Sequence, residues 1–183
     1  EKDGIVPKDI WLKAGEIGLL CPNIPVEYGG IGGDFRFNVI VIEELARVGA
    51  TGPGFAVHSD IVAPYLINYS SQNQKKEYLP KMVKGEIITA IAMTEPSTGS
   101  DLQNIKTRAN IKDNKIILNG SKTFITNGQN ADLVLVVAKT DNTKKAKGIS
   151  IILCEENRKG FQKGKNLKKI GMKAQDTSEL YFQ

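Results

Sequence analysis

Apolar residues recur every three or four positions through the first half of the chain and about every second position through the second half. The first spacing is typical of helices and the second of strands. We therefore expect helices over residues 7–20, 34–48, 55–69 and 71–84. The expected strands are 87–93, 107–111, 115–118, 122–125, 133–138, 149–153 and 179–182.

Residues that favour helix ends support this division. Asp34 is suited to cap the second helix, and Ser71 with Gln74 forms the sequence pattern of a capping box at the fourth. Pro64 and Pro80 lie inside helical patterns; Pro80 predicts a kink, and Pro64 predicts either a kink or a division into two pieces. Residues 112–114, Lys-Asp-Asn, are typical of a hairpin turn.

Two side-chain arrangements follow from the helical period. In the first helix, Ile10, Ala14 and Ile17 fall on one face, with Trp11 beside them. In the second helix, Glu44 lies on a mostly apolar stripe. We expect it either to pair with Arg47, three residues further on, or to cap backbone groups.

Together these patterns predict an α+β protein. An all-α helical domain over residues 1–86 is followed by a β-domain over residues 87–183, built as an antiparallel barrel or sandwich. Short strands separated by close turns favour that architecture over a parallel sheet.

Composition narrows the class of protein. The 183 residues are 40% hydrophobic and 25% charged, and no apolar run reaches the roughly 20 residues of a membrane-spanning helix. The net charge of +5 comes largely from residues 158–173, which hold seven basic and no acidic residues. We expect a solvated surface there; a binding site for phosphate groups of a ligand or for nucleic acid is the alternative. No aromatic stacking set accompanies the charge, so we expect no nucleic-acid partner.

The few metal-binding and nucleophilic side chains point to structural roles. Cys21 and Cys154 are far apart and lie among apolar neighbours, so we expect buried free thiols. His58 is the only histidine, and we expect it to be neutral and hydrogen-bonded. No metal site is expected, because one histidine with two separated cysteines has no metal-ligand spacing.

Two motifs in the second half carry a resemblance. They are 93–96 Met-Thr-Glu-Pro with 99–101 Gly-Ser-Asp, and 119–122 Asn-Gly-Ser-Lys with 125–128 Ile-Thr-Asn-Gly. In this order and spacing the chain resembles the acyl-CoA dehydrogenase family. Residues 29–34, 52–58 and 171–177 resemble its long-chain branch in particular. The resemblance covers nearly the whole chain.

The resemblance implies FAD-dependent α,β-dehydrogenation of acyl-CoA thioesters in fatty-acid β-oxidation. It implies that Thr94 hydrogen-bonds the pyrimidine side of the flavin, that Thr126 reaches N5 or O4, and that Phe124 packs on the ring. The implied cofactor-binding residues are Ile91, Ala92, Met93, Thr94, Glu95, Pro96, Ser97, Thr98, Gly99, Ser100, Phe124, Ile125 and Thr126. Ser100, Ala146 and Lys147 are implied to contact the acyl-CoA substrate.

No catalytic residue is expected within the chain. Glu95 lies in a turn between Thr94 and Pro96, and the family's base belongs to a C-terminal helical domain beyond Gln183. The resemblance further implies electron-transfer flavoprotein as acceptor and a homotetramer. It also implies a mitochondrial matrix location in a eukaryote or a cytoplasmic one in a bacterium. An oxidase or flavin monooxygenase on the same fold is one alternative, and a non-catalytic anion-binding module is a remote one.

Overall fold

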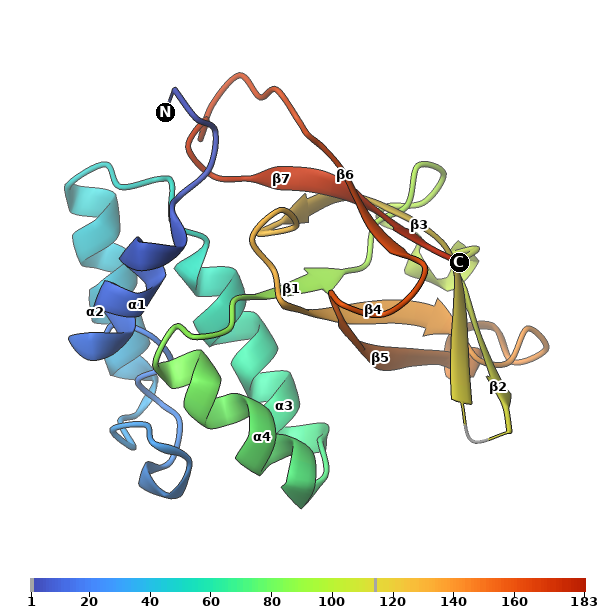
Figure 1. Ribbon diagram of the computed structural model, residues 1–183, viewed down its shortest axis with the longest axis horizontal. Coiled ribbons are helices and arrows are strands. Elements are labelled where there is room, and N and C mark those ends of the chain that lie inside the picture. The colour runs from blue at the N-terminus through green and yellow to red at the C-terminus, as the bar shows by residue number, and fades with distance from the viewer. Residues whose placement is uncertain (1, 114) are drawn as a thin grey trace.

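The computed structural model describes residues 2–113 and 115–183, and Figure 1 shows its helices gathered at one end and its strands at the other. Within these residues the chain forms four α-helices: α1 (Lys8–Glu16), α2 (Phe35–Arg47), α3 (Ala63–Tyr69) and α4 (Gln72–Val83). Shorter helical segments are η1 (Val26–Tyr28), the π-helical η2 (Val57–Val62), η3 (Leu102–Asn104) and η4 (Lys145–Gly148). The strands are β1 (Thr89–Ala92), β2 (Arg108–Lys112), β3 (Lys115–Thr126), β4 (Leu133–Lys139), β5 (Ile149–Glu155), β6 (Phe161–Asn166) and β7 (Thr177–Phe182). The α+β class expected from the sequence is confirmed.

The predicted capping residues occupy the helix ends. The Asp34 carboxylate accepts from the Arg36 backbone N–H at 2.9 Å at the start of α2. At the start of α4, Ser71 and Gln74 form both hydrogen bonds of a capping box. Pro64 lies in the first turn of α3, where its missing N–H costs little, and Pro80 lies inside α4.

The buried face of α1 differs from the prediction. The helix ends at Glu16, so Ile17 lies beyond it and is 72% exposed, and Ile10 is 39% exposed. The buried residues are Trp11 and Ala14. Trp11 packs edge-on against Phe55 with ring centroids 4.8 Å apart. Burial of this large ring therefore sets the orientation of the helix; of the predicted face, Ala14 is buried as expected, whereas Ile10 and Ile17 are not.

The seven strands form one curled, mixed sheet. Its strand order is β1-β4-β2-β3-β7-β6, and β5 pairs with β4. Most neighbours are antiparallel, as expected, but β1 runs parallel to β4 along its length, and β2 meets β4 in parallel at a single pair. Because β1 stands at the end of the strand order, one of its edges has no neighbouring strand.

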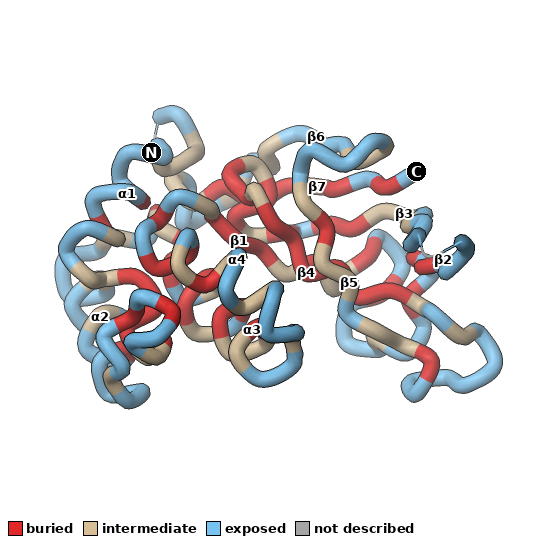
Figure 2. The backbone as a smooth tube through the Cα atoms, turned by 60° about the horizontal axis from the view of Figure 1, so that its bottom comes forward, coloured by how far each residue is buried: buried red, intermediate tan, exposed pale blue. Residues whose placement is uncertain are grey.

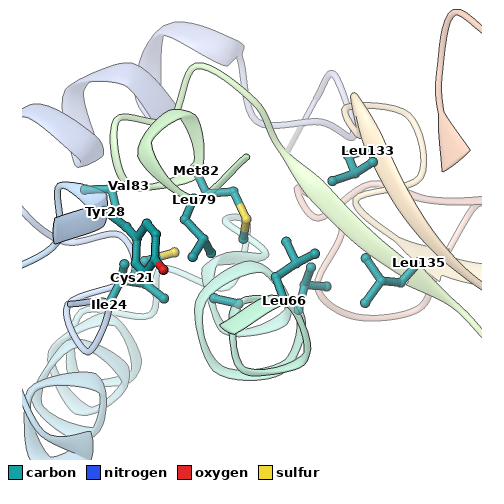
Figure 3. Close-up of a cluster of buried hydrophobic side chains, with 11 residues drawn as sticks. Cys21, Ile24, Tyr28, Leu66, Leu79, Met82, Val83, Leu133 and Leu135 are labelled. Atoms are coloured by element: carbon teal, nitrogen blue, oxygen red, sulfur yellow. The ribbon is translucent and has the colours of Figure 1, made fainter. Parts of the chain in front are cut away.

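Strand β4 joins the helices to the sheet. Its alternate side chains serve two cores: Leu133 and Leu135 pack with the helical cluster, whereas Val134 and Val136 pack within the sheet. Figure 3 shows Leu66 of α3 between the helical residues and these two leucines. A strand covered on both faces is apolar at successive positions, which explains the unbroken run of six apolar residues here.

Other differences from the prediction concern strand length. The two strands expected over 115–125 form the single strand β3, and β6 was not predicted because charged and polar residues interrupt it. The expected turn at 112–114 links antiparallel β2 and β3, although Asn114 itself lies outside the described residues. No helix in the described part of the chain is long and apolar enough to cross a membrane.

Helix α2 has an exposed apolar side. Phe37 and Ile40 are 46% and 56% exposed, and Val48, just after the helix, is 69% exposed. Figure 2 shows many exposed residues along the outer helices and mostly buried ones through β1 and β4. The predicted pairing of Glu44 with Arg47 is present, with Arg47 Nε donating to Glu44 Oε2 at 3.1 Å.

Candidate functional site

The loop that follows β1 makes a tight turn with an exposed tip. The Glu95 backbone N–H donates to the Thr98 carbonyl at 2.8 Å, and the Thr98 N–H donates back to the Glu95 carbonyl at 3.1 Å. Both of these residues are buried, whereas Pro96 and Ser97 at the tip are exposed. The turn therefore has a fixed base and an accessible tip.

A fully buried lysine joins this loop to β3. Lys122 Nζ donates to the Met93 carbonyl at 2.8 Å and to Glu95 Oε1 at 3.0 Å. Beside it, the Thr123 backbone N–H donates to the Thr94 carbonyl at 2.9 Å. These contacts bring the two sequence motifs side by side.

Glu95 is the partner of this lysine and has two further donors. The Lys106 backbone N–H lies 2.6 Å from Oε2, and the Thr107 N–H lies 2.9 Å from Oε1. Burial raises the pKa of Glu95, but hydrogen bonds from Thr107, Lys106 and Lys122 outweigh it, and the pKa lies below its usual value. Burial also lowers the pKa of Lys122, and Glu95 opposes this shift. A carboxylate held in this way is a structural anion and not a free base.

Strand β3 exposes an aromatic ring through a local irregularity. Its pairing with β7 shifts between Lys122 and Ile125. Phe124, within this shift, has a φ of 58°, and its side chain is 67% exposed. A left-handed backbone is uncommon for a bulky residue, and bulges often redirect a side chain. The next residues are buried Ile125 and half-buried Thr126.

The end of β3 is tied to the helical part of the chain. The buried Asn127 side-chain Nδ2 donates to the Gly54 carbonyl at 3.0 Å and to the Thr89 carbonyl at 3.1 Å. The approach is so close that a Cβ on Gly54 would lie 1.9 Å from Asn127 Oδ1. Only glycine therefore fits at position 54 without displacing the asparagine.

His58 also links the helical part of the chain to the sheet. Its Nε2 lies 3.1 Å from the Met82 carbonyl, and its Nδ1 accepts from the Thr89 backbone N–H at 3.2 Å. A ring with an accepting Nδ1 and a donating Nε2 is neutral. Burial lowers the pKa of His58 to about 4, opposed by the hydrogen bond to Met82. The expectation of a neutral, hydrogen-bonded histidine is confirmed.

The residues implied to bind substrate lie on two adjacent loops. Ser100 is exposed and comes just before η3, which packs against η4. Ala146 and Lys147 are exposed within η4. The structure therefore brings these loops together, although more than 40 residues separate them along the chain.

The side chains of Ile91 and Ala92 face protein rather than an open site. Ala92 is buried within the sheet, and Ile91 packs against the helical core. Any contact of these two residues with a ligand would therefore be made through the backbone and not through the side chains. Among the described residues there is also no group of three or more His, Cys, Asp or Glu side chains that could hold a metal ion.

Sequence reasoning missed two supporting residues. They are Lys122, which the sequence shows only as the last residue of a motif, and Asp176, for which the local sequence indicates no role. Asp176 Oδ2 accepts from the Gln129 backbone N–H at 2.7 Å, and its carbonyl accepts from Asn127 N–H at 3.2 Å, so it holds the turn after β3. For Lys122 a signal existed: a charged residue at an inward-facing strand position needs a buried partner.

Comparison with known proteins places this geometry in a family. The acyl-CoA dehydrogenase N-terminal domain matches residues 1–86, and the acyl-CoA dehydrogenase middle domain matches residues 90–183. Long-chain specific acyl-CoA dehydrogenase, mitochondrial, from Sus scrofa is 54% identical over 185 residues, covering 100% of this chain and 43% of that protein. The chain thus spans less than half the length of this relative.

Solved structures of acyl-CoA dehydrogenases share the fold of the whole chain. An acyl-CoA dehydrogenase from Geobacillus kaustophilus superposes with a TM-score of 0.97 at 49% identity, covering 100% of this chain and 48% of that one. A glutaryl-CoA dehydrogenase from Mycobacterium smegmatis, solved in complex with FADH2, gives 0.90 at 30% identity, covering 100% and 46%. With both domain matches in sequence order and the linked motifs in place, the chain belongs to the acyl-CoA dehydrogenase family.

Proposed function

We propose that the full-length protein is an FAD-dependent acyl-CoA dehydrogenase that converts long-chain acyl-CoA thioesters to trans-2-enoyl-CoA. The observation that carries this proposal is the buried link from Lys122 to Met93 and Glu95, which holds the two implied flavin-binding stretches side by side. The 54% identity to a long-chain specific relative supports the chain-length class.

Three features of the described residues fit a flat, polar-edged cofactor. Phe124 is exposed although its backbone is strained, and such outliers often mark functional positions. A Cβ on Gly99 would meet no atom within 4 Å, so packing does not demand glycine there, whereas close approach of a ligand would. Beyond Thr89, whose backbone groups bond His58 and Asn127, the outer edge of β1 has no neighbouring strand.

In this proposal the chain binds and orients the cofactor. Thr94 and Thr126 direct hydroxyl groups at the pyrimidine side and at N5 or O4, and Phe124 packs on the ring. The remaining residues proposed to line the cofactor are Ile91, Ala92, Met93, Glu95, Pro96, Ser97, Thr98, Gly99, Ser100 and Ile125. When bound, FAD supplies the acceptor for the β-hydrogen.

The proposal assigns substrate contacts to Ser100, Ala146 and Lys147. It assigns no catalytic base to this chain. Residues 1–86 act as a helical domain and 87–183 as a β-domain. Electron-transfer flavoprotein is the proposed acceptor and a homotetramer the proposed assembly. The proposed location is the mitochondrial matrix in a eukaryote or the cytoplasm in a bacterium.

The test is product analysis with the purified full-length protein. We expect palmitoyl-CoA to yield trans-2-hexadecenoyl-CoA when an artificial electron acceptor is present, with little hydrogen peroxide in air. Formation of peroxide in step with the enoyl product would instead indicate the acyl-CoA oxidase alternative. Absence of any enoyl product from flavin-loaded protein would contradict both.

A further inference from the structure

Thr126 is the last residue of β3 and lies between two anchored positions. It pairs with Thr177 at the end of the ladder between β3 and β7. Asn127 comes directly after Thr126, and Asp176 comes directly before Thr177. The Asn127 backbone N–H donates to the Asp176 carbonyl at 3.2 Å, so the two strands stay joined one residue beyond the ladder. The residue proposed to reach the flavin therefore lies where the backbone of both strands is fixed.

The backbone of Asn127 turns the chain out of β3. Its φ of 63° lies in the left-handed region, which glycine and asparagine enter more readily than other residues. Its carbonyl accepts from the Ala131 N–H at 2.7 Å, which closes the turn. This backbone conformation accounts for either glycine or asparagine at position 127. The presence of asparagine therefore points to a role for the side chain.

The side chain of Asn127 joins the end of β3 to two other segments. It is fully buried, and its Nδ2 donates to the Gly54 carbonyl at 3.0 Å and to the Thr89 carbonyl at 3.1 Å. Gly54 precedes η2 in the helical part of the chain, and Thr89 is the first residue of β1. Thr89 is itself held by His58, whose Nδ1 accepts from the Thr89 N–H at 3.2 Å. One amide thus fixes this end of β3 against the helices and against β1.

The direction of the Thr126 hydroxyl depends on this backbone. Thr126 is half-buried and β-branched, and a β-branched side chain has few χ1 rotamers available to it. A shift of the backbone at position 126 therefore moves the hydroxyl with it. A displacement of about 1 Å at a positioned group is enough to change a reaction rate by about 10²-fold.

We propose that Asn127 is a positioning residue that sets the reduction potential of the bound flavin through Thr126. This inference rests on the proposed function. The two Nδ2 hydrogen bonds hold the Thr126 backbone so that its hydroxyl donates to the flavin edge. A donor at that edge stabilises the ring when it carries the added electrons. Loss of the Asn127 side chain loosens the hydroxyl and makes reduction less favourable.

The test measures the two-electron reduction potential of the flavin in the full-length, flavin-loaded protein. Thr126→Val is the reference variant, because valine keeps the β-branched shape and removes the hydroxyl. We expect Thr126→Val to lower the equilibrium constant for reduction by about tenfold, which is about 30 mV for a two-electron couple. Asn127→Gly keeps the left-handed backbone and removes the side chain, so it should lower the potential by up to the same amount.

The double variant separates positioning from a general structural effect. If Asn127 acts through Thr126, adding Asn127→Gly to Thr126→Val should lower the potential no further, since no hydroxyl is left to position. Asn130→Gly is the matched control. Asn130 belongs to the same turn, is 5% exposed, and donates from Nδ2 to the Val6 carbonyl at 2.8 Å. Its loss should lower the free energy of unfolding and leave the potential unchanged.

If Asn127→Gly does not fold, Asn127→Ser is the second variant, because it shortens the side chain without adding charge and should shift the potential in the same direction. An unchanged potential in folded, flavin-loaded Asn127→Gly overturns the inference. So do additive shifts in the double variant, or an equal shift in Asn130→Gly.

An unchanged potential in Thr126→Val also overturns the inference, and the proposed function stands if the unsubstituted protein still dehydrogenates palmitoyl-CoA. An unsubstituted, folded protein that binds no flavin overturns the proposed function and this inference together.

Discussion

Replacing Lys122 with methionine tests the buried link between the two motifs. Methionine keeps much of the side-chain volume but removes the charge and both hydrogen bonds, to the Met93 carbonyl and to Glu95 Oε1. Breaking a buried ion pair by removing one partner typically costs about 3–5 kcal/mol, because the other charge stays buried without compensation. Glu95 keeps the Lys106 and Thr107 backbone donors, so we expect a loss near the lower limit, about 3 kcal/mol.

Urea unfolding of the full-length protein, followed by circular dichroism, measures the change in the free energy of unfolding. Lys13→Met is the matched control. Lys13 pairs with Asp9 at 3.1 Å, but the two side chains are 68% and 59% exposed, so its loss should stay below about 0.5 kcal/mol. The double variant Lys122→Met, Glu95→Gln should lose less than the sum of the single variants, since no uncompensated carboxylate remains.

The flavin content gives a second readout. Because Lys122 holds the Met93 carbonyl in place, Lys122→Met should also lower the ratio of bound flavin to protein, whereas Lys13→Met should not. A loss in Lys122→Met as small as that in Lys13→Met, with full flavin content, would refute the reasoning. It would mean that the loop after β1 is held without the ion pair.

Three further outcomes follow from the structure. The pKa of His58 is about 4 in the folded chain and near 6.5 in the unfolded one, so the unfolded state takes up the proton first as the pH falls. The free energy of unfolding should therefore fall by about 3 kcal/mol from pH 6.5 to 4. His58→Gln should lose less stability over this range, and equal losses in both proteins would contradict this. Burial raises the pKa of Cys21 to about 12 and that of Cys154 to about 11, so neither thiol forms the reactive thiolate at pH 8. After treatment with an alkylating reagent at pH 8, mass spectrometry should find both thiols unmodified until urea is added. Rapid labelling of the native protein would argue against their burial. Gly54→Ala should destabilise the protein by about 2 kcal/mol, because its Cβ would meet an amide oxygen at 1.9 Å. Gly99→Ala should change stability by less than about 0.5 kcal/mol yet reduce flavin retention, and the reverse order of effects would contradict the assigned roles.

Local sequence signals located the helix starts and the shared strand. Asp34 and the Ser71–Gln74 pair indicate helix starts because their side chains accept hydrogen bonds from backbone N–H groups that the first turn of a helix leaves without a partner. The apolar run of β4 indicates a strand buried on both faces, since no face is left for polar residues.

The buried face of α1, strand β6 and the buried ion pair depend on contacts between residues far apart in the sequence, which local signals do not reveal. The face of α1 is set by Trp11 packing on Phe55, 44 positions away, which helical period alone does not reveal. Strand β6 has a polar sequence because Lys163 reaches across to the Gln129 and Ala131 carbonyls. Likewise, the link from Lys122 to Glu95 depends on tertiary placement and not on local propensity.

The visible spectrum of the full-length protein tests the central claim most directly. It should be recorded before and after anaerobic addition of palmitoyl-CoA. We expect oxidised flavin bands in the purified protein and their bleaching on addition, because reduction of bound FAD accompanies dehydrogenation of the thioester. Bleaching with another acyl-CoA but not with palmitoyl-CoA would change the substrate and keep the reaction. An intact, folded protein that binds no flavin would contradict the proposed function.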